Sequence, residues 1–238
     1  MKKIAVLDWG IGGFAFVRAL RRAGHQTTVL YFSDSGMTPY GLQDPQTLHK
    51  RLEKVISWCR SKGCEGIVVA CNAASSVLQP AADVCGVIQP TIKAMRMHSS
   101  RYLHVIGGER TIDSGIFQKA FPYATFQVAQ PLSALIERGD MAGISRILPQ
   151  LLNSSQKELL CACTHYEAIE SLYYQNMPAL QSIYLPSHFT LSHLVSIWRL
   201  EHGEEPDTFY SSGDCSDAAV VKQVFGISWS NPIQQIIE

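Results

Sequence analysis

Two cysteines follow the ends of two apolar segments that have the same order of residue types. Cys71 ends one segment and precedes Asn72, and Cys163 ends the other and precedes Thr164. Open α/β sheets place their chemistry at strand ends. An isolated buried thiol usually only packs, but packing alone gives no reason for two matching strand ends. The pattern therefore predicts two thiols that act as an acid/base pair on one substrate.

Two further ionisable residues, Asp8 and His165, are placed where they could support these thiols. His165 follows Cys163 by two positions, and alternate side chains of an extended segment point to the same side. An imidazole beside a thiol can stabilise the thiolate. Asp8 ends an apolar segment before a glycine-rich turn. A carboxylate there is costly to bury unless it is used or hydrogen-bonded, so it either caps the turn or orients a thiol or a substrate ammonium.

Other chemistries fit these residues less well. Cys161, Cys163 and His165 lack the usual spacing of zinc ligands, and we expect no metal. The turn at residues 10–13 lacks the glycine spacing of a dinucleotide-binding fingerprint. Cys161 lies within its apolar segment, so we expect a core thiol there. A redox pair formed by Cys161 and Cys163 remains as an alternative.

The composition of the chain limits its partners. Lys plus Arg and Asp plus Glu number 20 each, so no overall charge favours nucleic acid or an anionic membrane. No apolar run approaches the length of a membrane span. The 7 cysteines are an odd number without the spacing of a disulfide scaffold, which indicates a reducing cytoplasm. We expect a cytoplasmic protein whose partner is a small molecule or a second copy of the chain.

Apolar segments alternate with helical ones, which predicts an α/β fold with parallel sheets. The order of strand, glycine turn and helix occurs after Asp8 and again at Gly107, just as the strand–cysteine order recurs. We interpret this as two pseudo-symmetric lobes, each a mostly parallel sheet flanked by helices, with the active site in the cleft between them. The first lobe comprises residues 1–95 and 206–238, and the second residues 96–205. Expected strands lie at residues 4–7, 28–32, 66–70, 84–88, 102–106 and 159–162, and expected helices at 14–23, 46–62, 113–120, 133–138 and 141–152.

Taken together, these motifs resemble the glutamate racemase family, within the cofactor-independent aspartate/glutamate racemases. The resemblance runs through nearly the whole chain. It is carried by the first strand with its glycine turn, the Pro39-Tyr40-Gly41 turn, the two cysteine motifs and the segments at residues 86–90, 111–115 and 209–214. It implies two lobes with the active site between them, and neither pyridoxal phosphate nor a metal.

The resemblance also implies a role for each site residue. Cys71 would exchange the α-proton of the D-amino acid and Cys163 that of the L-amino acid, with Asp8 and His165 supporting the two thiols. The residues that it places against the substrate are Trp9, Pro39, Tyr40, Gly41, Asn72, Ala73, Thr111 and Thr164.

The implied function is the interconversion of L- and D-glutamate, which supplies D-glutamate for peptidoglycan, and a homodimer is plausible. The chain departs from the family pattern at several positions. Trp9 stands where the family has a serine, Ala73 where it has a threonine, and Glu167 where it has a proline. Because two pocket hydroxyls are lost, two alternatives stay open: a racemase of another amino acid such as aspartate, and a catalytically silent amino-acid-binding homologue.

Overall fold

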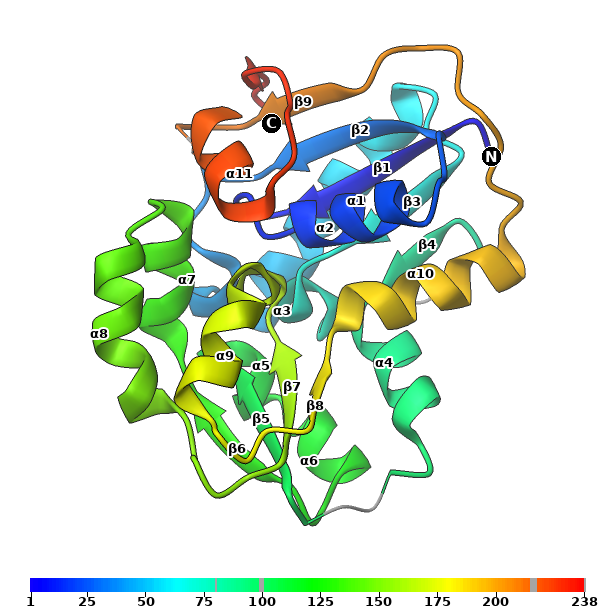
Figure 1. Ribbon diagram of the computed structural model, residues 1–238. Helices are drawn as coiled ribbons and strands as arrows, with labels where there is room; N and C mark the ends of the chain where they lie inside the picture. The colour runs from blue at the N-terminus through cyan, green and yellow to red at the C-terminus, as the bar shows by residue number, and fades with distance from the viewer. Residues whose placement is uncertain (80, 99–100, 215–217, 238) are drawn as a thin grey trace.

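The computed structural model describes residues 1–79, 81–98, 101–214 and 218–237, and within them the chain forms two separate parallel sheets (Figure 1). A six-stranded sheet has the order β10-β9-β2-β1-β3-β4, and a four-stranded sheet has the order β6-β5-β7-β8. In each sheet the first strand lies between the second and the third, with the fourth beyond the third. This shared order confirms the predicted α/β fold with two related lobes.

Each sheet has apolar side chains buried on both of its faces, as expected for parallel strands covered by helices. The first sheet consists of β1 (Lys3–Asp8), β2 (Thr28–Ser33), β3 (Gly66–Val69), β4 (Val84–Gly86), β9 (Thr208–Ser211) and β10 (Ile233–Gln234). The second consists of β5 (Leu103–Gly107), β6 (Thr125–Val128), β7 (Glu158–Ala162) and β8 (Ser182–Tyr184).

The helices connect and cover these strands (Figure 1). They are α1 (Phe14–Arg22), α2 (Pro45–Ser61), α3 (Asn72–Ser75), α4 (Ile88–Met95), α5 (Glu109–Asp113), α6 (Ile116–Ala120), α7 (Gln130–Glu137), α8 (Met141–Leu151), α9 (Glu170–Asn176), α10 (Pro186–Ile197) and α11 (Ala218–Phe225), with the 3₁₀ helices η1 (Tyr40–Leu42) and η2 (Thr164–Ile169). Among the described residues, no helix combines the length and the apolar composition needed to cross a membrane.

Local sequence explains where α2 begins. The Asp44 side chain accepts hydrogen bonds from the backbone N–H groups of Gln46 and Thr47, which is the usual cap of a helix start. Pro45 occupies the first turn, where its missing N–H costs nothing. The buried face of this helix includes Leu48 and Leu52, four residues apart.

Most expected elements differ from the structure only at their ends, as α7 does by beginning at Gln130, but two differ in kind. The strand expected at residues 84–88 ends at Gly86, and α4 begins at Ile88 because Pro90 suits the first turn of a helix. The helix expected at residues 113–120 is divided into α5 and α6 by Gly115, whose φ of 68° is left-handed and readily adopted only by glycine. The sequence analysis did not predict strands β6, β8, β9 and β10 or helices α3, α4, α9, α10 and α11.

The chain returns to the first sheet at its C-terminal end, where β9 pairs with β2 and β10 pairs with β9. Leu191, Leu194 and Trp198, from α10 and the residue after it, pack in the same apolar cluster as Ile4 of β1. The division of the chain into residues 1–95 with 206–238 and residues 96–205 stays a prediction. Residues 80, 99–100, 215–217 and 238 of those spans lie outside the described residues.

Candidate active site

A cavity of about 400 Å³ is lined by residues that follow strands of both sheets. Cys71, just after β3, and Cys163, just after β7, both line it. These two strands hold equivalent places in their sheets, since each pairs with the first strand of its lobe. The other expected site residues in the lining are Asp8, Trp9, Pro39, Tyr40, Gly41, Asn72, Ala73, Thr111 and His165. Thr164 does not line the cavity and is buried beside it.

His165 lies between Cys163 and a carboxylate that the sequence analysis did not single out. Its Nδ1 atom is 4.0 Å from Sγ of Cys163, and its Nε2 atom is 2.7 Å from Oε2 of Glu137. Burial lowers the pKa of His165, but the hydrogen bonds with Cys163 and Glu137 outweigh it and raise that pKa well above 6.5. His165 is therefore placed as an imidazolium beside one of the two sulfurs.

Asp8 lies at the end of β1 and is buried. Its Oδ1 accepts a 2.7 Å hydrogen bond from the backbone N–H of Trp9, and its Oδ2 accepts one of 2.9 Å from the hydroxyl of Thr164. Burial raises the pKa of Asp8 above 3.8, although the nearby His165 and these hydrogen bonds oppose the shift. A carboxyl with a raised pKa can accept and return a proton more readily than a surface aspartate.

The Cys71 thiol is hydrogen-bonded to Asp8. Burial and the negative charge of Asp8 raise the pKa of Cys71 well above 9.0, and a hydrogen bond from the backbone N–H of Ala74 partly opposes them. The charge of Cys163 also raises this pKa, so the two sulfurs are close enough to interact electrostatically. The two cysteines thus have different surroundings, a carboxylate at Cys71 and an imidazole at Cys163.

The side chain of Asn72 faces the cavity and is unusual in its hydrogen bonding. Asn72 is 2% exposed, and both its Nδ2 and Oδ1 atoms are buried without a partner among the described residues. A buried amide without partners is rare because it loses its hydrogen bonds to water. The most direct explanation is a donor and an acceptor that are reserved for a bound ligand.

The turn at residues 39–41 is held in place by a buried ion pair. The hydroxyl of Tyr40 donates a 2.6 Å hydrogen bond to Oδ2 of Asp34. Arg51 binds the same carboxylate through two nitrogens at 2.9 and 2.7 Å. The hydroxyl of Ser212, after β9, donates to Oδ1 of Asp34 at 2.7 Å. This network fixes the wall of the cavity formed by Pro39, Tyr40 and Gly41.

Trp9 fills part of the cavity wall. Its indole Nε1 donates a 2.7 Å hydrogen bond to the backbone carbonyl of Met37, so its only polar atom is occupied by the protein. The ring therefore presents an apolar surface to the cavity. Ala73, the other departure from the family pattern in this lining, is also apolar.

The glycine turn after Asp8 allows the two lobes to approach closely. A Cβ atom at Gly10 would collide with the carboxylate of Glu137, and one at Gly12 would collide with the ring of His165. These glycines are required because side chains of the second lobe lie directly against the backbone of the first. The turn serves the packing between the lobes, and its spacing is explained without a nucleotide.

Helix α7 supplies the site residues that the sequence analysis missed. Gln130, Glu137 and Arg138, at its start and end, line the cavity. The oxygen Oε2 of Glu137 also accepts a 3.0 Å hydrogen bond from the backbone N–H of Ile11. Nothing in the spacing of these residues distinguishes them from other polar residues at helix ends. Only the placement of α7 across the cavity reveals them.

Comparison with known protein sequences finds similarity to glutamate racemases. The glutamate racemase of Aquifex aeolicus is 31% identical over 184 residues, which are 71% of this chain and 72% of that protein. The glutamate racemase of Ralstonia pickettii is 32% identical over 186 residues, which are 70% of this chain and 66% of that protein. The chain belongs to the aspartate/glutamate racemase family. Models of known protein families, by contrast, give no match to this sequence.

Solved structures show the same fold for this racemase homologue. The glutamate racemase of Thermus thermophilus in complex with β-chloro-D-alanine has a TM-score of 0.84 at 23% identity, covering 99% of this chain and 97% of that one. The glutamate racemase of Francisella tularensis in complex with D-glutamate has a TM-score of 0.82 at 20% identity. The match covers 100% of this chain and 98% of that one. The aspartate racemase of Picrophilus torridus has a TM-score of 0.63 at 16% identity, covering 84% and 96%. At these identities the likeness shows the fold.

Proposed function

We propose that this chain is a cofactor-independent racemase that interconverts L- and D-glutamate with Cys71 and Cys163 as its acid/base pair. The observation that carries the proposal is that both thiols line one cavity from equivalent strand ends of two lobes. A racemase must remove the α-proton from one face of its substrate and return a proton to the other. Two like groups that line one cavity from two lobes suit that task.

The surroundings of the two sulfurs support a division of labour. A free thiol has a pKa of about 8.5, so it is mostly protonated at neutral pH and must be activated to act as a base. The His165 imidazolium stabilises negative charge on Cys163, whereas the raised pKa of Cys71 keeps that thiol protonated. We therefore assign Cys163 as the base and Cys71 as the acid for the L-isomer, because the imidazole of His165 lies beside Cys163.

The reverse reaction requires Cys71 to be the base. Asp8 is hydrogen-bonded to Cys71 and has a raised pKa, so it is placed to take the proton of that thiol. Cys163, once protonated, then supplies the proton to the opposite face of the substrate. Each thiol is left in the protonation state needed for the opposite isomer, as two-base catalysis demands.

Substrate binding is assigned to neutral donors and acceptors of the cavity. The unpartnered amide of Asn72 can both donate to the substrate carboxylate and accept from its ammonium. Thr111 and the backbone of the Pro39-Tyr40-Gly41 turn lie in the same lining. Besides these neutral groups, the guanidinium of Arg138 in the lining suits a second carboxylate.

Aspartate is the second candidate substrate because of Trp9. The indole occupies cavity space and offers no hydrogen bond to a ligand. A side chain one methylene shorter than glutamate would need less room. A supply of D-glutamate for peptidoglycan, a cytoplasmic location and a homodimer are further parts of the proposal.

The test is exchange of the α-proton in D₂O. Purified protein is incubated with L-glutamate, D-glutamate, L-aspartate and D-aspartate, and deuterium at Cα is measured together with optical rotation. We expect exchange and racemisation of glutamate, and their loss in Cys71→Ser and Cys163→Ser. Exchange with aspartate alone would favour the second candidate. Stabilisation by glutamate without any exchange would identify a silent binding homologue and exclude a racemase.

A further inference from the structure

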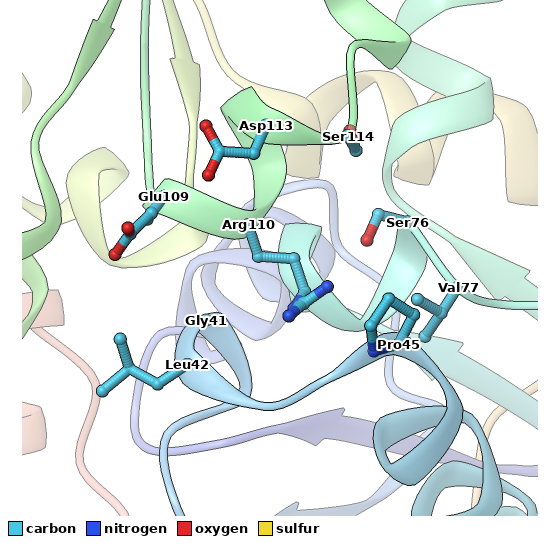
Figure 2. A pocket seen from close by; sticks show the side chains of 9 residues that line it. All are labelled: Gly41, Leu42, Pro45, Ser76, Val77, Glu109, Arg110, Asp113 and Ser114. Carbon is cyan, nitrogen blue, oxygen red and sulfur yellow. The ribbon is translucent and has the colours of Figure 1, made fainter.

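A second cavity, of about 470 Å³, adjoins the candidate active site (Figure 2). Gly41 and Leu42 of η1 line both cavities. The rest of its wall comes from the start of α2, the two residues after α3, and one side of α5 with Ser114 after it, so both lobes contribute. Its polar lining residues are Ser76, Glu109, Arg110, Asp113 and Ser114.

Arg110 is the distinctive residue of this cavity. Figure 2 shows its guanidinium extending from α5 into the space between Gly41 and Ser76. Its Nε atom is buried without a hydrogen-bond partner, and no carboxylate among the described residues forms an ion pair with it. A buried donor of a charged group normally has a partner. The planar fork of a guanidinium matches a carboxylate or a phosphate.

The charges around Arg110 narrow the choice of partner. Glu109 and Asp113 line the same cavity, and Figure 2 shows their carboxylates turned away from the guanidinium. No cation among the described residues pairs with either carboxylate. Two uncompensated negative charges disfavour a purely anionic ligand and favour one that also carries a positive group. The hydroxyls of Ser76 and Ser114 each donate to a backbone carbonyl. The Ser114 oxygen also accepts a long hydrogen bond from the backbone N–H of Ile116, so Ser76 supplies the freer acceptor.

We propose that this second cavity binds a free amino acid, with its carboxylate on Arg110 and its ammonium facing the carboxylates and hydroxyl oxygens of the same lining. The site is separate from the catalytic cavity, because neither cysteine lines it. Its volume accommodates a molecule of this size. The inference stands on the geometry of Arg110 and does not require the chain to racemise glutamate.

The experiment is a thermal-shift screen of the whole chain against the twenty L-amino acids, D-glutamate and inorganic phosphate, followed by calorimetric titration of each positive. The variants are Arg110→Gln, the matched control Arg146→Gln on the exposed face of α8, and Asn72→Ala in the catalytic cavity. We expect at least one amino acid to bind the wild type, Arg146→Gln and Asn72→Ala, and to bind Arg110→Gln at least tenfold more weakly.

The outcomes separate this site from the catalytic one. If every amino acid that binds is lost in Asn72→Ala and retained in Arg110→Gln, the second site is excluded and the catalytic proposal is unaffected. Inorganic phosphate that binds through Arg110 as tightly as any amino acid identifies a plain anion site and overturns the proposal. Binding that depends on Arg110 but not on Asn72 supports it, even if no substrate is racemised. An unliganded Tm of Arg110→Gln equal to that of the wild type shows that the loss is not a folding defect.

Discussion

The oxygen Oε2 of Glu137 lies 2.7 Å from Nε2 of His165 and also accepts a hydrogen bond from the backbone N–H of Ile11. One carboxylate therefore joins the end of α7, the start of η2 and the glycine turn after β1. It raises the pKa of His165 and holds the ring beside Cys163. In the proposed mechanism Glu137 is a positioning residue, since it would act on the thiol through the imidazole.

Glu137→Gln is expected to lower kcat for L-glutamate by about ten- to a hundredfold. The amide keeps the shape of the side chain but no longer favours the imidazolium, so the pKa of His165 falls. Activity that requires the charged ring is then lost at a lower pH, and the alkaline limb of the kcat profile moves to lower pH. The pH profile of kcat, measured separately for L-glutamate and for D-glutamate as the substrate, tests this effect. Glu53→Gln on the exposed face of α2 is the control, and an unchanged limb in Glu137→Gln would contradict the assignment.

Cys161→Ser and Cys163→Ser are expected to differ sharply although they lie two residues apart. Cys161 is fully buried in the apolar cluster of the second lobe, and its pKa is raised well above 9.0 by burial. Cys161→Ser should keep most of the turnover and lose about 1–3 kcal/mol of stability, measured by urea unfolding. Cys163→Ser should lose racemisation. Loss of activity in both variants would instead favour the thiol-redox alternative.

Trp9→Ser is expected to change which substrate is preferred. The substitution opens the cavity and provides a hydroxyl that can bind the ligand, whereas the indole N–H is bound to Met37. We expect kcat/KM for glutamate to rise relative to that for aspartate by about tenfold, which corresponds to about 1.4 kcal/mol. Competition assays with both amino acids measure the ratio. Trp58→Phe controls for the loss of an indole, because Trp58 is half-buried against the apolar cluster of the first lobe and does not line the cavity. A fall of the ratio would show that Trp9 contacts glutamate favourably.

Glu167→Gln is expected to remove a pH dependence of stability. Glu167 is fully buried and accepts hydrogen bonds from the backbone N–H and the hydroxyl of Ser187. Burial raises its pKa from 4.5 to about 7, although the Ser187 hydrogen bonds oppose the shift. Between pH 4.5 and about 7, Glu167 is ionised in the unfolded chain and protonated in the folded protein. The stability that Glu167 contributes is therefore present below pH 4.5 and is lost as the pH rises toward 7.

The size of this effect follows from the pKa shift. At 1.36 kcal/mol per pKa unit, the change from 4.5 to about 7 corresponds to about 3 kcal/mol. Urea unfolding of the wild type and Glu167→Gln at pH 4.5 and pH 7.5 measures it. The stability of the variant relative to the wild type should increase with pH. A difference that is the same at both pH values would show that Glu167 is ionised in the folded protein.

The sequence by itself determined the alternation of strands and helices and the two cysteine motifs. Strands β1, β3 and β7 were predictable because each is a short apolar run that is buried on both faces. Strands β6 and β8 were missed because most of their residues are only half-buried, so they lack that pattern. The strand expected through residue 88 was too long because Val87 and Ile88 are apolar in a helix start as well.

Only the tertiary structure decided which side chains meet. Glu137 and Asp8 are far apart in sequence, yet Glu137 is hydrogen-bonded to His165 and Asp8 interacts with it electrostatically, because the glycine turn lets the lobes close on each other. The unpartnered amide of Asn72 and the position of Arg110 in a second cavity are likewise products of packing between the lobes. Local patterns encode strand ends and thiols, because those depend on neighbours along the chain. The environment that sets protonation and ligand binding depends on contacts between the two lobes. The spacing of residues along the sequence does not reveal those contacts.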